Sequence, residues 1–559
     1  MKTINFIKNL AVCLIFPAYI LFSSNLFAGQ IAAKNGMVVT GHPVASQFGV
    51  EILKSGGNAI DAAVAAAIIA GVAEPHASGI GGGGAMLIYL QEQDSLSYIN
   101  YYQQTPALLP GAYDPARDND QASSVLVPGT IAGLHFALTN YGTIQWKDLL
   151  HLAADKMEAG FRIDDHLHGI ILDSYEKLLK YPETRQIYLP NDLPPASGEY
   201  IQNVDIIITL RKLANFGPEV FYRGDIADSI ETVILQHGGT LRKTDLNNYK
   251  VRQLSPLRGN YRDYTIYSAP PPQSGLTIIE TLNILEFKKL SEMGNYTKFA
   301  ASFHFMAEAM KRAYADRLTY LSDPLFVDVP TDVLINKEFA RSRFEDIDFS
   351  KANPAQPKKT KPGDIRPLLS SDPDDKGCTT HISVVDAQGN AVSLTQTLNR
   401  FWGCGITVGG FLLNNGMTSF SGGNSVNRIE PNKQPRSTIS PTLIFKNNRL
   451  FMVIGSPGAG AIISTLVEVI CQIVDFNKTP EAANQAPRFC SRKWSDNLPL
   501  ESNFSPALID SLITLGHPIR VMNALDSYFG GVQLIVVDFS NGELIGSSDP
   551  RRSGTAIGY

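Results

Sequence analysis

Cys378-Thr379-Thr380-His381-Ile382-Ser383-Val384-Val385-Asp386 is the stretch that decides the fold of this chain. It is typical of a β-strand, and Thr379 stands at its start. A threonine in this place can become a nucleophile if the peptide bond before it is cut. The new α-amino group then lies beside its own hydroxyl and acts as its general base. The stretch therefore predicts a hydrolase or transferase that cuts itself between Cys378 and Thr379.

A second strand-like run, residues 390–397, predicts a hairpin with the first. Ala387-Gln388-Gly389 lies between the two runs. A three-residue hairpin loop usually ends with a residue in the left-handed conformation, which Gly389 can adopt. In this register Thr397 faces Thr379, with the Cβ atoms about 4.5–5.5 Å apart. If the loop had only two residues, Thr379 would no longer face Thr397. Thr397 could also be an ordinary strand threonine with no chemical role.

The turn Gly455-Ser456-Pro457-Gly458-Ala459-Gly460 is the second candidate feature. It follows a strand-like run, 450–454, and precedes a predicted helix, 461–474. Backbone N–H groups at a glycine-rich turn into a helix suit the negative oxygen that develops during acyl transfer. A tight strand-to-helix turn with no chemical role fits the pattern equally well.

Composition bounds the class of protein. The chain has 559 residues, is 44% hydrophobic and carries a net charge of −5, with a pI near 6.1. Length and apolar content suffice for a large core. The charge gives no reason to expect nucleic acid or an anionic membrane as a partner.

The N-terminus predicts export. Lys2 and Lys8 precede a mostly apolar run, 10–22, and a cleavage signal ends at Ala28. Residues 1–28 are therefore predicted to be a signal peptide of a periplasmic or secreted protein. No later segment reaches the roughly 20 apolar residues that a membrane span needs.

Several motifs point away from cofactors and metals, and we expect neither. Gly79-x-Gly81-x-x-Gly84 matches a dinucleotide fingerprint, but it follows a predicted helix and precedes a strand, the reverse of what that motif requires. His166-x-His168, beside two aspartates, lacks a third ligand cluster. No Cys-x-x-Cys pair suggests zinc. Once Cys13 leaves with the signal, four cysteines remain, which allow one disulfide but fix no pairing.

Other elements follow from apolar spacing. Residues 44–53 predict an amphipathic helix, and 58–73 predict a helix that is apolar on all sides and therefore buried. Residues 85–90 read as a strand, and Phe299 to Met310 lie in another long helix. Residues 348–377, rich in Pro, Lys, Asp and Ser, predict a flexible surface segment leading to Thr379.

Over residues 35–559 the chain resembles the γ-glutamyltransferase family. The resemblance lies in long, specific motifs: residues 56–63, 81–84, 127–130, 306–309, 314–317, 379–386, 412–415, 431–433, 455–458 and 548–551. It implies an α+β fold, the four-layer αββα sandwich of N-terminal-nucleophile hydrolases. It also implies autocatalytic cleavage into a large subunit, 29–378, and a small catalytic subunit, 379–559, held together noncovalently.

The same resemblance implies roles for individual residues. Thr379 would be the nucleophile of both scission and catalysis, Thr397 would support it by hydrogen bonding, and Gly458 and Ala459 would supply the oxyanion-hole N–H groups. The second of these is normally glycine. The substrate would be a γ-glutamyl (glutathione-like) acyl donor, with an amino acid, a peptide or water as acceptor.

Departures from the family pattern concern substrate binding. The arginine that holds the α-carboxylate falls on Tyr102, and the Ser-Ser pair appears as Ser437-Thr438. Around the α-amino group the asparagine is Asn399, whereas the polar and acidic positions fall on Gly416 and Ser419. Losing two charged contacts, at about 1.5–3 kcal/mol each, would weaken recognition by roughly 10²–10⁴. Arg400 or Arg436 are candidates to replace the lost arginine.

Three functions fit these observations. The first is a γ-glutamyltransferase-family enzyme, with hydrolysis favoured because the segment between Phe420 and Pro431 is short and leaves the site open to water. The second is an amide acylase for a different acyl group, glutaryl or poly-γ-glutamyl. The third is an unprocessed binding protein that has lost the chemistry, against which the intact Thr379, Thr397 and Gly458 argue.

Overall fold

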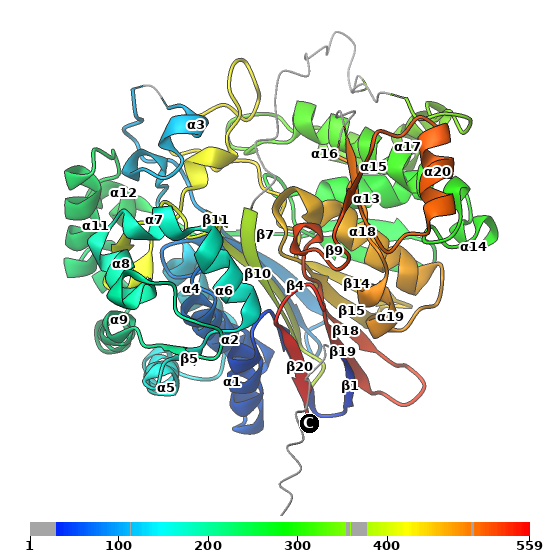
Figure 1. The fold of residues 1–559 in the computed structure, drawn as a ribbon. Coiled ribbons are helices and arrows are strands. Elements are labelled where there is room, and N and C mark those ends of the chain that lie inside the picture. The colour runs from blue at the N-terminus through cyan, green and yellow to red at the C-terminus, as the bar shows by residue number, and fades with distance from the viewer. Residues whose placement is uncertain (1–28, 112, 354–357, 359–376, 493–496) are drawn as a thin grey trace, which may run out of the picture.

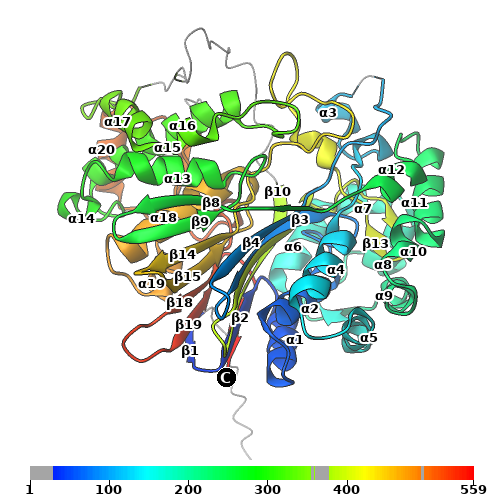
Figure 2. The ribbon, with the colours of Figure 1, turned by 180° about the vertical axis from the view of Figure 1, so that it is seen from behind.

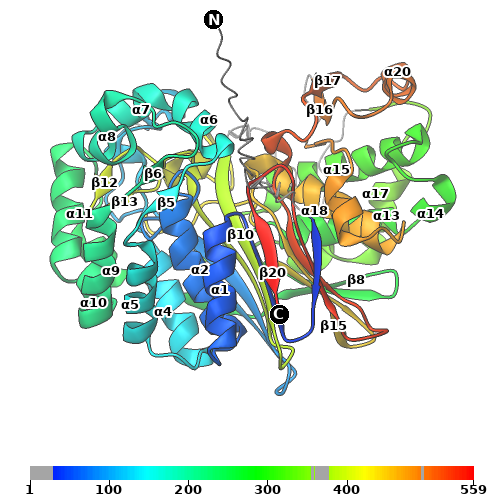
Figure 3. The same ribbon diagram turned by 60° about the horizontal axis from the view of Figure 1, so that its bottom comes forward.

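Two seven-stranded antiparallel sheets, stacked face to face, form the centre of the molecule (Figure 1). The computed structural model describes residues 29–559 except 112, 354–357, 359–376 and 493–496. The predicted signal peptide, 1–28, and most of the predicted surface segment, 348–377, lie outside the described residues. Helices cover both outer faces, so the α+β expectation of four layers is met (Figure 3).

The Thr379 sheet, which holds the strand that begins beside Thr379, packs against helices from the first half of the chain. Its strands run in the order β20 (Thr555–Gly558), β2 (Gly36–Thr40), β10 (Gly377–Asp386), β11 (Ala391–Arg400), β3 (Gly83–Leu90), β4 (Ser95–Tyr101) and β7 (Arg252–Leu254). Its outer face is covered mainly by α1 (Pro43–Lys54), α2 (Ala59–Ala73), α4 (Thr130–Tyr141) and α5 (Trp146–Met157).

The Gly458 sheet, whose strand β15 leads to the glycine-rich turn, forms the other half. Its order is β1 (Gln30–Ala33), β19 (Leu544–Ser548), β18 (Gln533–Val537), β15 (Arg449–Gly455), β14 (Thr442–Lys446), β9 (Tyr264–Ser268) and β8 (Leu257–Tyr261). Figure 2 shows α13 (Gly275–Leu285), α15 (Ala300–Tyr320) and α18 (Ile462–Val474) on this flank.

The remaining elements are short or peripheral. On the Thr379 side these are α3 (Pro115–Asp118), α6 (Asp165–Asp173), α7 (Tyr175–Leu179), α8 (Pro182–Tyr188), α9 (Val204–Phe216), α10 (Glu219–Tyr222), α11 (Asp225–Gln236), α12 (Lys243–Asn248) and the pairs β5 (Phe161–Arg162) with β6 (Tyr200–Ile201) and β12 (Thr407–Val408) with β13 (Phe411–Leu412). On the other side they are α14 (Leu290–Met293), α16 (Thr331–Leu334), α17 (Lys337–Glu345), α19 (Pro480–Gln485), α20 (Pro506–Thr514) and the parallel pair β16 (Leu498–Glu501) with β17 (Ile519–Met522).

The element predictions are confirmed with small shifts at the ends. The helix predicted at 58–73 is α2, and every residue in it except Gly71 is buried. It begins at a capping box in which Asn58 accepts from the Asp61 N–H while the Asp61 carboxylate accepts from the Asn58 N–H. The predicted helices and strands at 44–53, 85–90 and 461–474 correspond to α1, β3 and α18.

Strands of the two predicted subunits pair with each other in both sheets. In the Thr379 sheet, β2 pairs with both β10 and β20, and β3 pairs with β11. In the Gly458 sheet, β1 pairs with β19, and β9 pairs with β14. The carbonyl of Tyr559 also accepts hydrogen bonds from the N–H groups of Lys34 and Asn35. Each sheet is therefore built from both sides of the Cys378–Thr379 bond.

Two further expectations concern covalent and membrane features. Cys378, Cys404, Cys471 and Cys490 are all buried, and no disulfide joins them. Among the described residues, no helix combines the length and apolar character needed to cross a bilayer.

Candidate active site

The β10–β11 hairpin places Thr379 at the edge of the space between the two sheets. The predicted register holds from the Val385–Ala391 pair to the Thr380–Gln396 pair. Gly389 closes the turn with φ +84°, as expected for a left-handed loop residue. Beyond Thr380 the register shifts, and the next pair is Cys378 with Asn399. The shift is a β-bulge, which takes Thr379 out of the regular ladder.

The two threonine hydroxyls converge on the bond that is predicted to break. The Thr379 Oγ1 lies 2.5 Å from the carbonyl oxygen of Cys378 and 3.2 Å from the Thr397 Oγ1. The Thr397 hydroxyl donates to the same carbonyl oxygen. Thr379 is 7% exposed. The predicted proximity of Thr379 and Thr397 is thus confirmed, and the Cys378 carbonyl is polarised by two hydroxyl donors.

The glycine-rich turn offers backbone donors beside this bond. Gly458 has φ +121°, and a Cβ there would lie 2.6 Å from the Gly530 Cα. Ala459 has φ +47°, so it holds the left-handed region that the family fills with glycine. The N–H groups of both residues donate no hydrogen bond to any other described residue. They are therefore available to a developing oxyanion.

A small cavity, here called the Thr379 cavity, brings most predicted site residues together. Its volume is 40 Å³, room for a few water molecules and far below the roughly 300 Å³ at which ligand pockets begin. In the uncut chain this cavity is therefore smaller than a typical ligand pocket. The lining comprises Tyr102, Arg317, Thr379, Thr397, Asn399, Ser419, Arg436, Ser437, Thr438, Ile439, Ala459 and Gly460.

Three predicted residues are not part of this lining. One is Cys378, at the predicted cleavage site, and another is Gly458, which lines a neighbouring, larger cavity. Gly416 is buried behind the site, because its N–H donates to the Asn414 Oδ1 at 3.0 Å and its Cα faces Leu126. The prediction that Gly416 contacts substrate therefore receives no support from the geometry, whereas Ser419, in the same short helical turn, reaches the cavity.

Asn399 is held in a strained position that aims its side chain at the site. Its φ is +84°, its N–H donates to the Thr397 Oγ1 at 2.8 Å and its Nδ2 donates to the Ser419 Oγ at 2.8 Å. The Oδ1 is buried and has no hydrogen-bond partner among the described residues. Left-handed backbone at a residue other than glycine is uncommon and clusters at functional sites.

The charges of the Thr379 cavity are positive. Arg317 and Arg436 belong to its lining, and none of its lining residues is Asp or Glu. Arg436 is 2% exposed, and its guanidinium donates to the Leu318 carbonyl and to Ser421. Sequence reasoning had named Arg436 but missed Arg317. Arg400, the other candidate, lines the neighbouring cavity instead.

A buried group of titratable side chains lies beside Thr380, next to the predicted nucleophile, and was not predicted. The Thr380 hydroxyl donates to the Glu74 carboxylate at 2.7 Å. Burial raises the pKa of Glu74 to about 7, against the opposing effects of the Thr380 hydrogen bond and the Arg552 charge. Burial lowers the pKa of His166 to about 4, and this ring lies 2.9 Å from the Arg552 Nη1. These residues come from distant segments, so no sequence spacing could reveal them.

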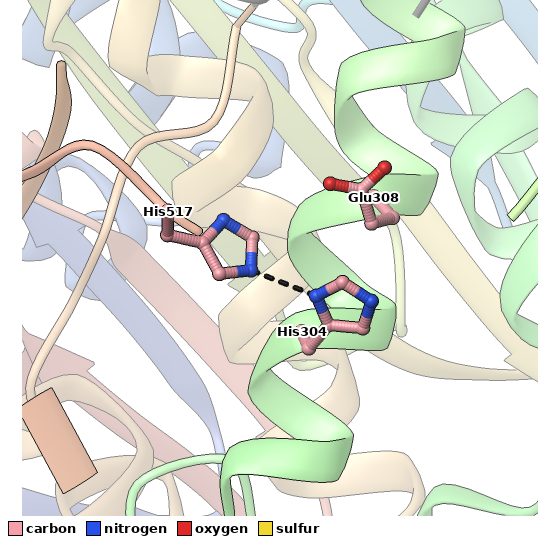
Figure 4. A group of neighbouring side chains, drawn as sticks. All are labelled: His304, Glu308 and His517. Atoms are coloured by element: carbon pink, nitrogen blue, oxygen red, sulfur yellow. Dashed lines mark hydrogen bonds between the residues drawn. The ribbon is translucent and has the colours of Figure 1, made fainter. Parts of the chain in front are cut away.

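His304, Glu308 and His517 lie close enough to share a metal ion (Figure 4). The ring nitrogens of His304 and His517 are 2.8 Å apart, and the other nitrogen of His304 lies 2.8 Å from the Asp348 carbonyl. The Glu308 carboxylate is bound by Lys311 and Arg312. Two cations on the only carboxylate of the group oppose a divalent metal, so we interpret it as a buried hydrogen-bond network. His166 and His168 likewise bind different partners, Arg552 and the Pro195 carbonyl.

Comparison with known proteins places this geometry among characterised enzymes. A family model described as gamma-glutamyltranspeptidase matches residues 45–559. The chain is 37% identical over 545 residues to a glutathione hydrolase proenzyme of Escherichia coli, covering 93% of this chain and 91% of that protein. It is 33% identical over 542 residues to an acylase ACY 1 proenzyme of a Pseudomonas species, covering 93% of each.

A solved structure extends the likeness to the whole fold. The crystal structure of a cephalosporin acylase from Bacillus halodurans superposes with a TM-score of 0.85 at 28% identity, covering 98% of this chain and 99% of that chain. The expected fold is thereby confirmed, since gamma-glutamyltranspeptidases and acylases of this kind share the N-terminal-nucleophile architecture.

Proposed function

The chain belongs to the gamma-glutamyltranspeptidase family of enzymes, and from that membership we propose that it cuts its own backbone and then transfers or hydrolyses acyl groups through Thr379. The observation that carries the proposal is the hydrogen bond of 2.5 Å from the Thr379 Oγ1 to the carbonyl oxygen of Cys378, which holds this hydroxyl beside the bond to be broken. The presence of Thr397 on the same carbonyl supports it. The relatives named as proenzymes are consistent with it.

Self-cleavage would begin with attack of the Thr379 Oγ1 on the carbonyl carbon of Cys378. The C–N bond breaks as the C–O bond forms, so the peptide becomes an ester and the nitrogen takes up a proton. The Thr397 hydroxyl, already bonded to the carbonyl oxygen, would stabilise the negative charge that develops there. Water then hydrolyses the ester. The products are a Cys378 carboxylate and a free Thr379 α-amino group.

The mature enzyme would reuse the same hydroxyl. The α-amino group of Thr379 takes the Oγ1 proton, and Oγ1 attacks the carbonyl of the donor amide. The N–H groups of Gly458 and Ala459 would hold the oxyanion. The leaving amine receives the proton, and the acyl-enzyme ester passes its acyl group to water or to another amine. Thr397 would remain the hydrogen-bond partner of Thr379.

The donor would be a γ-glutamyl-type acyl group with altered recognition of its α-groups. Tyr102, Ser419, Asn399, Ser437 and Thr438 line the cavity in which those groups would bind. An α-carboxylate is compatible with a lining that contains two arginines. An α-ammonium has no carboxylate partner there. The charge pattern therefore also favours the second candidate, an acylase for desamino dicarboxylic acyl groups such as glutaryl.

Hydrolysis of paired anilides tests the donor class. We expect the glutaryl anilide to be cleaved at a rate comparable to or above that of the γ-glutamyl anilide. A strong preference for the γ-glutamyl compound would show that the amino group is recognised after all. The ratio of hydrolysis to transfer, with and without a dipeptide acceptor, then measures how open the site is to water.

Electrophoresis tests self-cleavage and separates an enzyme from an unprocessed binding protein. The purified protein should give two bands under denaturing conditions, and the shorter should begin Thr-Thr-His-Ile. Thr379→Ala should give one band and no turnover. An uncut preparation with full activity would refute the proposal. Export, with removal of residues 1–28, forms part of the proposal and is checked by the N-terminal sequence of the longer band.

A further inference from the structure

A second cavity, here called the Gly458 cavity, begins where the Thr379 cavity ends. Its volume is 840 Å³, near the upper limit of about 1,000 Å³ for small-molecule sites. The two cavities share walls, because Asn399 and Ala459 line the first while their chain neighbours Arg400 and Gly458 line the second. The candidate oxyanion donors therefore stand on the boundary between the two spaces.

The lining of the Gly458 cavity is rich in charge and predominantly basic. The basic residues are Arg117, Lys177, Lys180, Arg400, Arg520 and Arg552, and the acidic residues are Asp120, Asp173, Glu176 and Asp526. Ion pairs take charge from both sides. Asp120 pairs with Lys177 at 2.6 Å, and Arg117 pairs at 2.6 Å with Asp118, which lies outside the lining. The basic residues of the lining therefore keep a small majority over the acidic ones.

The guanidinium group of Arg520 can receive an anion. Arg520 is exposed on β17, and its side chain has no hydrogen bond or ion pair to any other described residue. Arg552 is bound through its Nη atoms to His166 and the Ser527 carbonyl, and its Nε is buried, so it adds positive charge to the wall but offers no exposed donor. Met522 follows Arg520 by two positions on the same strand, so both face the cavity.

We propose that the Gly458 cavity binds the amine half of the reaction, and that it is shaped for an acidic peptide longer than a dipeptide. This rests on the proposed function. During acyl transfer the reacting carbonyl lies between the Thr379 hydroxyl and the N–H groups of Gly458 and Ala459. The acyl group extends into the Thr379 cavity. The amide nitrogen and its substituent must then extend into the Gly458 cavity, which has the larger volume and the basic side chains.

The same cavity serves the leaving group and the acceptor, because the two steps are the reverse of each other. In transfer, the amine nitrogen attacks the acyl carbon of the Thr379 ester. A C–N bond forms and the C–Oγ bond breaks. The proton lost by the amine reaches Oγ1 through the Thr379 α-amino group, so no further reactant is needed. A carboxylate on the peptide would pair with Arg520, since guanidinium binds carboxylate through two parallel hydrogen bonds.

The test uses amides that share the acyl group selected by the anilide panel and differ in the amine: Gly-Glu-Glu, its isosteric control Gly-Gln-Gln, and Gly-Gly. For the mature enzyme, kcat/KM for the Gly-Glu-Glu amide should exceed that for the Gly-Gln-Gln amide by about 5–20-fold, the range of one or two charge-assisted contacts. Arg520→Gln should remove most of that ratio. Arg258→Gln, an exposed arginine on β8 that lines neither cavity, should leave the ratio unchanged.

Equal rates for the Glu and Gln amides, or a preference that survives Arg520→Gln, would overturn the inference while leaving the proposed function intact. A calorimetric titration of Gly-Glu-Glu into the mature enzyme further separates a failure of the inference from a failure of the proposed function, because the titration needs no turnover. If no amide is hydrolysed, the proposed function fails and the cavity has no reaction to serve, but binding that is lost in Arg520→Gln would still show that it takes an acidic peptide. Absence of binding in the wild type would refute it.

Discussion

The Thr397 hydroxyl contacts both the hydroxyl of Thr379, the proposed nucleophile, and the carbonyl oxygen of Cys378 in the bond that is proposed to break. Removing one oxyanion donor typically slows acyl transfer about 10²–10³-fold. Thr397→Ala should therefore slow self-cleavage by roughly that factor, whereas Thr397→Ser keeps the hydroxyl and should lose much less. The fraction of cut chain against time, read from denaturing gels, gives both rates. Equal rates in the two variants would show that the hydroxyl is dispensable.

Ala459 carries a Cβ in a left-handed conformation, which disfavours an L-residue by roughly 1–2 kcal/mol. Glycine avoids that strain but loses about 0.5–1 kcal/mol through its freer unfolded chain. Ala459→Gly should therefore raise the free energy of unfolding by about 0–1 kcal/mol and retain activity, because the N–H remains. Gly458→Ala, whose Cβ would collide with Gly530, should lower the free energy of unfolding by more than about 2 kcal/mol. Urea midpoints of the two variants test this contrast.

Glu74 predicts a pH dependence of stability. Its pKa is raised to about 7 in the folded chain from an ordinary value of 4.5, so folding favours the neutral carboxyl. The resulting stability is fully present below pH 4.5 and is lost as the pH rises through 7. Relative to the parent chain, the free energy of unfolding of Glu74→Gln should therefore increase between pH 5 and pH 8, by at most about 3 kcal/mol.

The measurement is thermal unfolding of the uncut Thr379→Ala chain with and without Glu74→Gln at several pH values. Glu51→Gln is the matched surface control, because Glu51 pairs with Lys156 near solvent and its pKa is lowered. That control should change stability by less than about 1 kcal/mol. A Glu74→Gln effect that stays constant with pH would contradict the assignment.

How far residue-level prediction reached is clear from Thr379 and its neighbours. The Thr379–Thr397 proximity followed from the position of Gly389 alone, since the turn sets the register of the hairpin. The register shift between Cys378 and Thr380 could not be predicted, because the turn at Gly389 sets only the register that starts from it. Arg317 was missed as a lining residue because it lies on α15, which no local pattern links to the site.

At the scale of elements, Asp386 joins the hairpin turn to the start of α2. Its carboxylate accepts hydrogen bonds from the N–H groups of Ala59, Gln388 and Asn390. Asp386→Ala would leave these donors without a partner, at about 1–3 kcal/mol for each one that water cannot reach. We expect Asp386→Ala to lower the free energy of unfolding by about 2–4 kcal/mol. Asp386→Asn, which keeps one acceptor oxygen, should lower it by about half as much. Denaturant unfolding of the uncut chain measures both, and equal losses would contradict this role.

Element prediction succeeded where apolar pattern and capping agree. Helix α2 was recognisable because Ala, Ile and Val occupy all its faces and Asn58 with Asp61 marks its start. Gly416 was predicted to contact substrate from its position in the family pattern. Its N–H donates to the Asn414 Oδ1 at 3.0 Å and it is not part of the cavity lining, so the contact stays a prediction.

At the scale of the whole molecule, both predicted subunits contribute strands to both sheets. Separating them after the cut would expose the edges of β2, β9 and β14 and much of the core between the sheets. The cleaved protein should therefore unfold in one transition, and its two pieces should elute together without denaturant. Because no disulfide joins the described cysteines, a reductant should make no difference. Elution of the small piece alone in native buffer would refute this.

The two cavities and the Glu74 group mark the limit of prediction from sequence. Glu74, Thr380 and Arg552 meet only after the chain has formed the whole Thr379 sheet with its covering helices. The Gly458 cavity likewise gathers residues between 117 and 552. Long-range packing of this kind leaves no period or spacing in a single sequence.

The contact of Tyr559 with Lys34 and Asn35 has a practical consequence for biosynthesis. A gene rearranged to start at codon 379, run to 559, and continue through a short glycine-serine bridge into residue 30 would keep every strand pairing. Initiator methionine is removed before small residues, so translation itself would deliver the threonine amine. Such a permuted protein should be active without self-cleavage. Substitutions that block only self-cleavage should not affect its activity.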